Sequence, residues 1–255
     1  MSTWMKAMAG AVALWAASAG AAGLTAAQIV DRNVAARGGL EAWRAVKTIS
    51  MSGEMDAGGT KAVRLPFEMS LKRPHKSRLE LHIVDQVAVQ TWDGAHGWKY
   101  RPYLGRTEAE PLAAAEAQQA ARADELDGVL VDHARKGIRV ELQGSEKVEG
   151  REAYRLLLTQ AGHPARRLWV DAATFLEVKM DGEPRRIDGR ERKVSLYYRD
   201  YRKVGALSLP HTLETVVEGV KGPAAHRISV RKVTVNPALA DELFGKPQPA
   251  RAAAA

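Results

Sequence analysis

The chain has 255 residues, of which 45% are hydrophobic and 27% are charged, and this composition excludes a disordered or fibrous protein. It contains no cysteine, which excludes disulfide scaffolds, thiol catalysis and thiolate metal sites. The formal net charge is +8, a balance that in a cytosolic protein would suggest a nucleic-acid partner.

The first residues are typical of a secretory signal peptide. Lys6 lies in a short polar start, residues 7–19 form an apolar run, and residues 20–22 are small, as a signal peptidase requires. The run is too short to span a bilayer, which needs about 20 apolar residues. We therefore expect residues 1–22 to be removed. Without a cysteine to carry a lipid anchor, the mature chain is expected to be soluble in the periplasm.

Export argues against a nucleic-acid partner, so the positive charge needs a different explanation. It suits anionic lipid head groups or an acidic protein partner, although simple solubility explains it equally well.

The mature chain begins with a predicted helix. Thr25 and Gln28 have the spacing of a capping box, and Gly38-Gly39 is typical of a helix end because glycine adopts the left-handed conformation without strain. A short helical turn is expected over residues 40–46.

From residue 49 the hydrophobic period changes to two. Apolar and polar residues alternate through 49–55, 65–71, 79–83 and 87–92, and Asp93-Gly94 predicts a turn before 97–101. This pattern is typical of antiparallel strands with one apolar face. Core packing explains any single apolar residue there, but together with later strands they are expected to line an apolar cavity: Met51, Met55, Leu65, Phe67, Met69, Leu79, Leu81, Ile83, Val89, Trp98, Leu156 and Leu158.

Residues 108–136 interrupt the strands and are rich in good helix formers, with Gly128 marking a joint. We expect a helical lid whose stripe of Leu126, Val129 and Leu130 plugs the empty cavity. Its many alanines offer little apolar area, so weak docking is predicted. Strands resume over 138–142, 153–159, 167–170, 176–180, 194–201, 209–217 and 227–235, followed by a short helix at 239–244 and a disordered tail at 248–255.

These elements predict one domain over residues 23–247, a mainly β (α+β) fold of about eleven strands. The helices are too few to fill a wide curved sheet, so a cavity suited to an acyl chain is expected, and flexible methionines would let it adapt.

Catalytic motifs are missing. There is no nucleophile elbow, zinc-protease motif, P-loop or dinucleotide glycine pattern, and the seven histidines are scattered. We therefore expect no catalytic residue, no metal and no cofactor. The basic run at residues 185–193 is either a contact for an anionic surface or a solvated hairpin loop.

Three motifs carry a family resemblance: Arg37-Gly-Gly-Leu-Glu-Ala-Trp43, Leu71-Lys72-Arg73-Pro74, and Trp92-Asp93-Gly94 with residues 98–102. With later matches at 150–154, 168–171, 209–211 and 235–237, they resemble the outer-membrane lipoprotein-sorting proteins, the LolA/LolB-like carriers. The resemblance implies an incomplete, half-open antiparallel β-barrel with helices as a lid over an apolar cavity. It also implies that Arg73, at the family's Lys-Arg-Pro position, bonds the lid closed.

The first functional hypothesis is a monomeric periplasmic carrier for lipid or acylated lipoprotein cargo, with an inner-membrane donor and an outer-membrane acceptor as possible partners. The second is a lipid-sensing or protein-interaction module of the same fold. A lipid hydrolase with an unrecognised site is third, because the sequence favours a protein that is not an enzyme.

Overall fold

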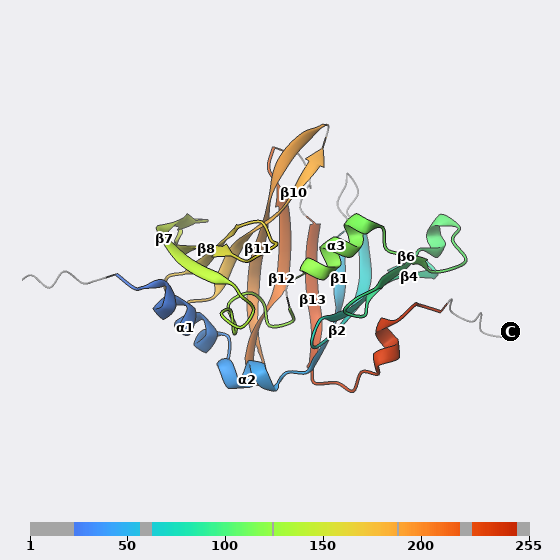
Figure 1. Ribbon diagram of the computed structural model, residues 1–255, viewed down its shortest axis with the longest axis horizontal. Coiled ribbons are helices and arrows are strands. Elements are labelled where there is room, and N and C mark those ends of the chain that lie inside the picture. Colours follow the sequence, from blue (N-terminus) through green and yellow to red (C-terminus); the bar gives the residue numbers. More distant parts are fainter. Residues whose placement is uncertain (1–22, 57–62, 124, 188, 220–225, 249–255) are drawn as a thin grey trace, which may run out of the picture.

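The computed structural model describes residues 23–56, 63–123, 125–187, 189–219 and 226–248 (Figure 1). The predicted signal peptide and most of the predicted tail lie outside the described residues. Among the described helices, none is long and apolar enough to cross a membrane.

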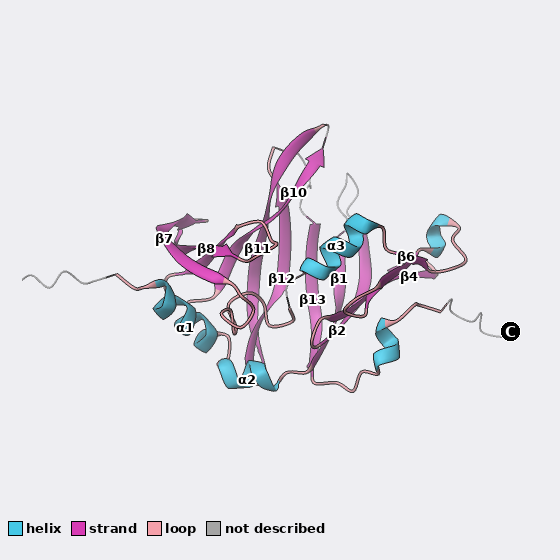
Figure 2. Ribbon diagram, viewed as in Figure 1, coloured by secondary structure: helices cyan, strands magenta, loops and turns pink. Residues whose placement is uncertain are grey.

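The fold is one antiparallel sheet of thirteen strands (Figure 2). The spatial order is β6-β5-β4-β3-β2-β1-β13-β12-β11-β10-β9-β8-β7, so the first strand pairs with the last one and the sheet stays open. This confirms the predicted incomplete antiparallel barrel, with two more strands than expected. The strands are β1 (Thr48–Asp56), β2 (Arg64–Lys72), β3 (Lys76–Ile83), β4 (Gln86–Trp92), β5 (Gly97–Tyr100), β6 (Glu110–Pro111), β7 (Arg139–Val148), β8 (Arg151–Thr159), β9 (Arg166–Asp171), β10 (Glu177–Ile187), β11 (Arg190–Val204), β12 (Leu207–Val217) and β13 (His226–Val235).

The N-terminal helices follow the local sequence signals. Helix α1 (Ala26–Ala36) begins at the predicted Thr25–Gln28 capping box, and α2 (Leu40–Ala45) follows the glycine pair. Gly38 has a φ of 121°, and a Cβ there would lie 2.4 Å from the carbonyl oxygen of Ala206. Glycine is therefore required where the chain turns close to the sheet.

The two edge strands of the sheet, β6 and β7, are consecutive in the chain. The connection between them, residues 112–138, must therefore cross the sheet from one edge to the other. It contains α3 (Ala114–Arg122) and then a run of turns. In Figure 1 the two edges curve toward the viewer and the central strands lie behind α3, so the connection crosses the concave side.

The core consists of two clusters on that concave side. One holds Ile29 and Val30 of α1 against β8, β9 and β10, and the other holds Trp43 and Val46 against the ends of β1 and β12. Both clusters contain residues of the connection, since Leu130 belongs to the first and Val131 to the second.

The C-terminal segment covers the opposite face of β2–β4. It contains the short helix η2 (Asp241–Phe244), where the sequence predicts a helix, and Phe244 is fully buried. Arg78 donates to the Leu243 carbonyl and Thr91 to the Gly245 carbonyl, so this segment is fixed along β3 and β4. A second short helix, η1 (Pro102–Leu104), follows β5.

Candidate functional site

An apolar strip runs across the concave face of β1, β2 and β3. Met51 pairs with Met69, and Met69 pairs with Leu79, so these three side chains share one face because directly opposed residues in an antiparallel pair point the same way. The next row joins Phe67 to Leu81. By the same alternation Met55, Leu65 and Ile83 belong to this face, and eight of the predicted cavity residues therefore lie together.

The strip continues through β13 and β12 to β11. Met55 pairs with Ile228, Ile228 with Leu213, and Leu213 with Tyr198. These last three residues were not predicted to belong to the site, although their strands were predicted. Assigning them to the site requires knowing that β1 pairs with β13, strands from the two ends of the chain. Local periodicity does not reveal that pairing.

Most of the strip is only half-buried. Of the residues in these rows, Phe67 is buried, whereas Met51, Met69, Leu79 and Leu81 keep intermediate exposure. Contiguous apolar surface that the protein's own core leaves partly open is typical of a binding surface. We call this strip, from Leu81 on β3 to Tyr198 on β11, the apolar trough.

Two predicted cavity residues lie on the wrong face. Val89 pairs with Glu80 and Trp98 pairs with Thr91, on the face opposite Leu81. The reason is the tight turn at Val84-Asp85, after which Ile83 pairs with Gln86. A two-residue turn exchanges odd and even positions between the two strands, so continuing the odd-numbered pattern into β4 was wrong. Val89 is instead buried on the face that the C-terminal segment covers.

Leu156 and Leu158 face the concave side but do not line the trough. Both are buried in the cluster beneath α1, together with Leu130 and Val129 of the connection. Their contribution is to the packed core.

The predicted helix over residues 108–136 is wrong outside Ala114–Arg122. Residues 126–137 form consecutive turns, with Gly128 at a φ of 77° and Asp132 at 51°. Burial overrides helix propensity here, because the segment inserts side chains into both core clusters and satisfies its polar groups through ion pairs. We call residues 125–137 the base segment.

The base segment is firmly docked, which contradicts the weak docking expected for it. Leu130 and Val129 are 0% and 6% exposed, respectively, and Leu126 packs against the second cluster. These three predicted plug residues therefore close the base of the concave side as part of the core.

Arg73, which the resemblance gives the role of bonding a lid closed, contacts the side chains of two residues at the start of the base segment. Its Nη1 lies 3.0 Å from Glu125 Oε2 and its Nη2 lies 2.6 Å from Asp127 Oδ2. The backbone carbonyls that accept from Arg73 belong to Trp43 and Val46, at the end of α2. Arg73 thus joins α2 to the base segment.

A buried ionic network, not foreseen from the sequence, extends from this point. Lys136 Nζ lies 2.5 Å from the other carboxylate oxygen of Asp127, whose side chain is 2% exposed. Arg37 donates to the Asp127 carbonyl and lies 3.2 Å from Glu177.

Tyr201 closes this network by donating to Glu177 over 3.0 Å. Burial and, after it, the Glu177 charge raise the pKa of the Tyr201 phenol well above its ordinary value, so it stays a donor. Both carboxylates of this network, Asp127 and Glu177, are paired with cations. Paired buried charges of this kind support the fold rather than a proton-transfer reaction.

Helix α3 is the weakly held part of the connection. None of its residues is buried. Glu116 accepts from Lys99 over 2.5 Å and from Arg101 over 3.1 Å, and its pKa is lowered mainly by the Lys99 hydrogen bond. At the other end the His75 ring lies 3.0 Å from the Ala120 carbonyl. The expectation of weak docking through alanines therefore applies to α3.

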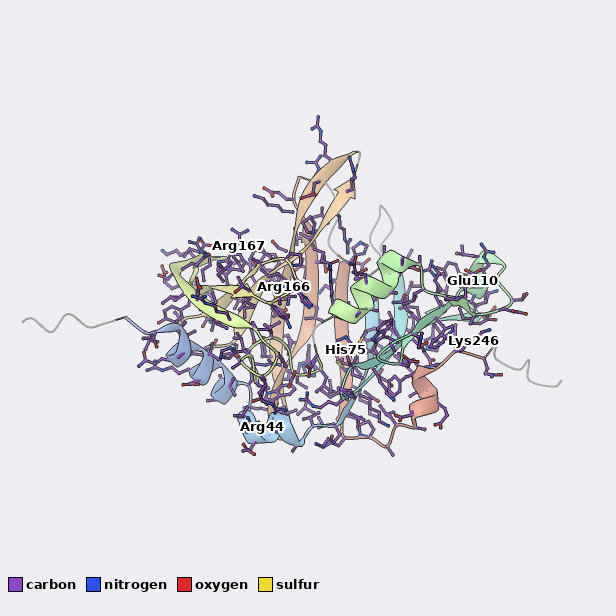
Figure 3. The ribbon with its side chains drawn as sticks, in the orientation of Figure 1. Arg44, His75, Glu110, Arg166, Arg167 and Lys246 are labelled. Carbon is purple, nitrogen blue, oxygen red and sulfur yellow. The ribbon has the colours of Figure 1, made fainter. Side chains whose placement is uncertain are left out.

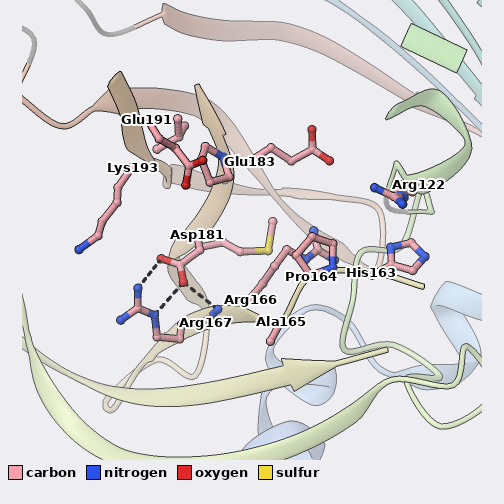
Figure 4. A pocket seen from close by; sticks show the side chains of 14 residues that line it. Arg122, His163, Pro164, Ala165, Arg166, Arg167, Asp181, Glu183, Glu191 and Lys193 are labelled. Carbon is pink, nitrogen blue, oxygen red and sulfur yellow. Dashed lines mark hydrogen bonds and ion pairs between the residues drawn. The ribbon is translucent and has the colours of Figure 1, made fainter. Parts of the chain in front are cut away.

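A cavity of about 360 Å³ lies where α3 approaches β10 (Figure 4). Met180 and Val194 give it an apolar part, and Arg122 and His163 stand at its rim. Arg167 and Asp181 are paired beside it at 2.7 Å. Within the described part of the chain, no three His, Asp or Glu side chains are grouped as a metal site would require.

No protein-family model and no curated protein matches the sequence. Solved structures do match its fold. A LolA superfamily protein from Nitrosomonas europaea has 14% identity and a TM-score of 0.59, over 88% of this chain and 99% of that chain. A putative outer membrane lipoprotein-sorting protein domain from Vibrio parahaemolyticus has 13% identity and a TM-score of 0.57, over 84% and 94%.

A DUF1329 family protein from Desulfovibrio piger gives a TM-score of 0.60 at 15% identity, over 87% of this chain and 97% of that chain. The chain therefore has the fold of LolA superfamily proteins, and the resemblance carried by its motifs is confirmed at the level of the fold.

Proposed function

We propose that this LolA-like chain binds the acyl chain of a lipid or of an acylated lipoprotein in the apolar trough and carries it through the periplasm. The single observation behind this proposal is the half-buried row of apolar side chains from Leu81 to Tyr198. Each methylene group withdrawn from water there contributes about 0.8 kcal/mol, so one long chain supplies several kcal/mol of binding free energy.

The surroundings of the trough support a site that can open. Its base is closed by the firmly docked base segment, whereas α3, which crosses it, is held by polar contacts at its two ends. An element with no buried side chain opens at a low free energy, and ligand that occupies the trough would favour the open state.

The test uses two substitutions on neighbouring residues of β3. Leu81→Glu places a carboxylate in the trough, and His82→Glu places the same group on the other face, where His82 pairs with Val87. Affinity for a fluorescent fatty acid should fall about tenfold or more in Leu81→Glu, because the acyl chain would desolvate a charge, and should stay near the native value in His82→Glu. Equal affinities in the two variants would remove the trough as the binding site.

A lipid-sensing module would share this binding step and differ in the fate of the ligand. A carrier releases its ligand to acceptor vesicles, so transfer of the fluorescent fatty acid from the protein to lipid vesicles distinguishes the two. Retention of the ligand together with capture of a protein partner would favour the sensor.

A further inference from the structure

Strands β10 and β11 extend beyond their neighbours and form an arm. The last pair that β9 makes with β10 is Leu168–Met180, and the pairing of β12 with β11 ends at Val217–Val194. Residues 185–187 and 190–192 pair with each other, and within the described part of the chain no other strand pairs with them. In Figures 1 and 3 this hairpin stands away from the rest of the molecule.

The register assigns the side chains of the arm to two sides. Arg192 and Arg190 continue the even-numbered row of β11 that begins with the trough residue Tyr198 and passes through Leu196 and Val194. Arg185 pairs with Arg192, and Ile187 pairs with Arg190, so all four lie on this side, which we call the inner side of the arm. The row thus changes along β11 from apolar in the trough to cationic on the arm.

The charges of the inner side have no acidic partner among the residues that the structure describes. Arg185 directly opposes Arg192, and a pair of like charges across two strands destabilises a hairpin. No ion pair of the described residues involves either arginine or Arg190, and the Arg192 Nε is buried without a hydrogen-bond partner. Glu191 lies on the other side, opposite Arg186. An arrangement that costs stability and leaves the Arg185 and Arg190 side chains exposed without an ion pair in the described part of the chain is one that fits an anionic partner.

We propose that the inner side of the arm docks on the surface of a lipid bilayer that contains anionic head groups. Charge complementarity favours this partner, since each arginine held near an anionic surface contributes to binding. Ile187 favours a bilayer over an acidic protein, because an apolar side chain among arginines is typical of segments that enter the head-group region. This docking goes beyond the proposed acyl binding, although the row through Val194 would lead an acyl chain from the bilayer to the trough.

The test compares two double variants that remove the same charge. Arg185→Gln with Arg190→Gln changes the inner side, and Lys203→Gln with Lys232→Gln changes exposed lysines that have no ion pair among the described residues. Sedimentation is measured with vesicles of phosphatidylethanolamine and phosphatidylglycerol and with vesicles of phosphatidylcholine alone. The native chain should bind only the anionic vesicles, and binding should weaken about thirtyfold in the arm variant but little in the lysine variant.

Three outcomes would overturn the proposal. The first is that the native chain binds both kinds of vesicle equally, and the second is that both double variants lose the same amount of vesicle binding. The third is that the arm variant binds vesicles as the native chain does, which would leave an acidic protein as the partner of the arm. Vesicle docking by Leu81→Glu keeps the two proposals separate, because that variant should lose fatty-acid binding and still sediment with anionic vesicles.

Discussion

Arg73 Nη2 lies 2.6 Å from Asp127 Oδ2, and this ion pair joins the turn between β2 and β3 to the base segment. The pair is the centre of a chain of contacts, because Arg73 also donates to the carbonyls of Trp43 and Val46, and Asp127 also binds Lys136. The base of the trough is therefore held by ionic contacts as well as by the two apolar clusters.

Replacing Arg73 by Met should destabilise the fold. Asp127 would keep only Lys136 as a charged partner in a buried position, and removing one member of a buried pair costs about 3 kcal/mol. Urea denaturation should show this loss in the free energy of unfolding. Arg139→Met, which breaks an exposed pair with Glu141, should change it by less than about 1 kcal/mol. Similar values for both variants would mean that the Arg73 contacts are not important for stability.

Truncating Leu130 to Ala should lower the free energy of unfolding by about 3 kcal/mol, because its side chain is fully buried in the first cluster. Affinity for a fluorescent fatty acid should change little, since the base segment is core and lies outside the trough. Increased affinity at unchanged stability would instead identify Leu130 as a plug that competes with ligand.

Phe244→Ala should destabilise the fold by about 3–4 kcal/mol, because Phe244 is fully buried against the outer face of the sheet. Lys246, two residues later in the chain, has an exposed side chain, so Lys246→Ala serves as the control. It should leave the free energy of unfolding unchanged. Neither variant should alter fatty-acid affinity after allowance for the folded fraction. A specific loss of affinity in Phe244→Ala would mean that the ligand uses the covered face.

Helix α3 should open on acidification before the sheet does. The pKa of Glu116 is lowered in the folded protein, chiefly by the Lys99 hydrogen bond, so its contribution is present above the ordinary glutamate pKa and is lost as the pH falls through the lowered value. Hydrogen exchange of Ala114–Arg122, normalised to an unfolded peptide, should therefore accelerate in that acidic range. Glu116→Gln should exchange fast at neutral pH and show no such acceleration. Protection equal to that of Leu130 would contradict a loosely held α3.

Local patterns predicted the strands well and their relative facing less well. Leu79 and Leu81 follow β2 through a three-residue connection, which preserves the odd-numbered face, whereas the Val84-Asp85 turn reverses it and misplaces Val89. A single misjudged turn therefore changes the face of every later residue in the hairpin, Trp98 included.

The base segment illustrates a second limit. Alanine and leucine favour a helix in isolation, but Asp127 is held by Arg73 and Lys136. Arg73 is distant in the sequence, and no local pattern pairs Lys136 with Asp127. Contacts of this kind depend on which strands are neighbours, and the pairing of β1 with β13 cannot be derived from periodicity. The role of Arg73 was accessible only through the motif that it occupies.

The positions of β6 and β7 at opposite edges of the sheet have a mechanical consequence. The connection over residues 112–138 is anchored at both margins of the sheet and, through the base segment, in the core, so α3 is a strap of fixed contour length between β6 and that inner anchor. Flattening the sheet would pull the strap taut across the trough, and stronger curling would slacken it. The space beneath α3 therefore changes together with the curvature of the sheet. A bulky ligand can enter only if the sheet changes its curvature or α3 unwinds and becomes longer.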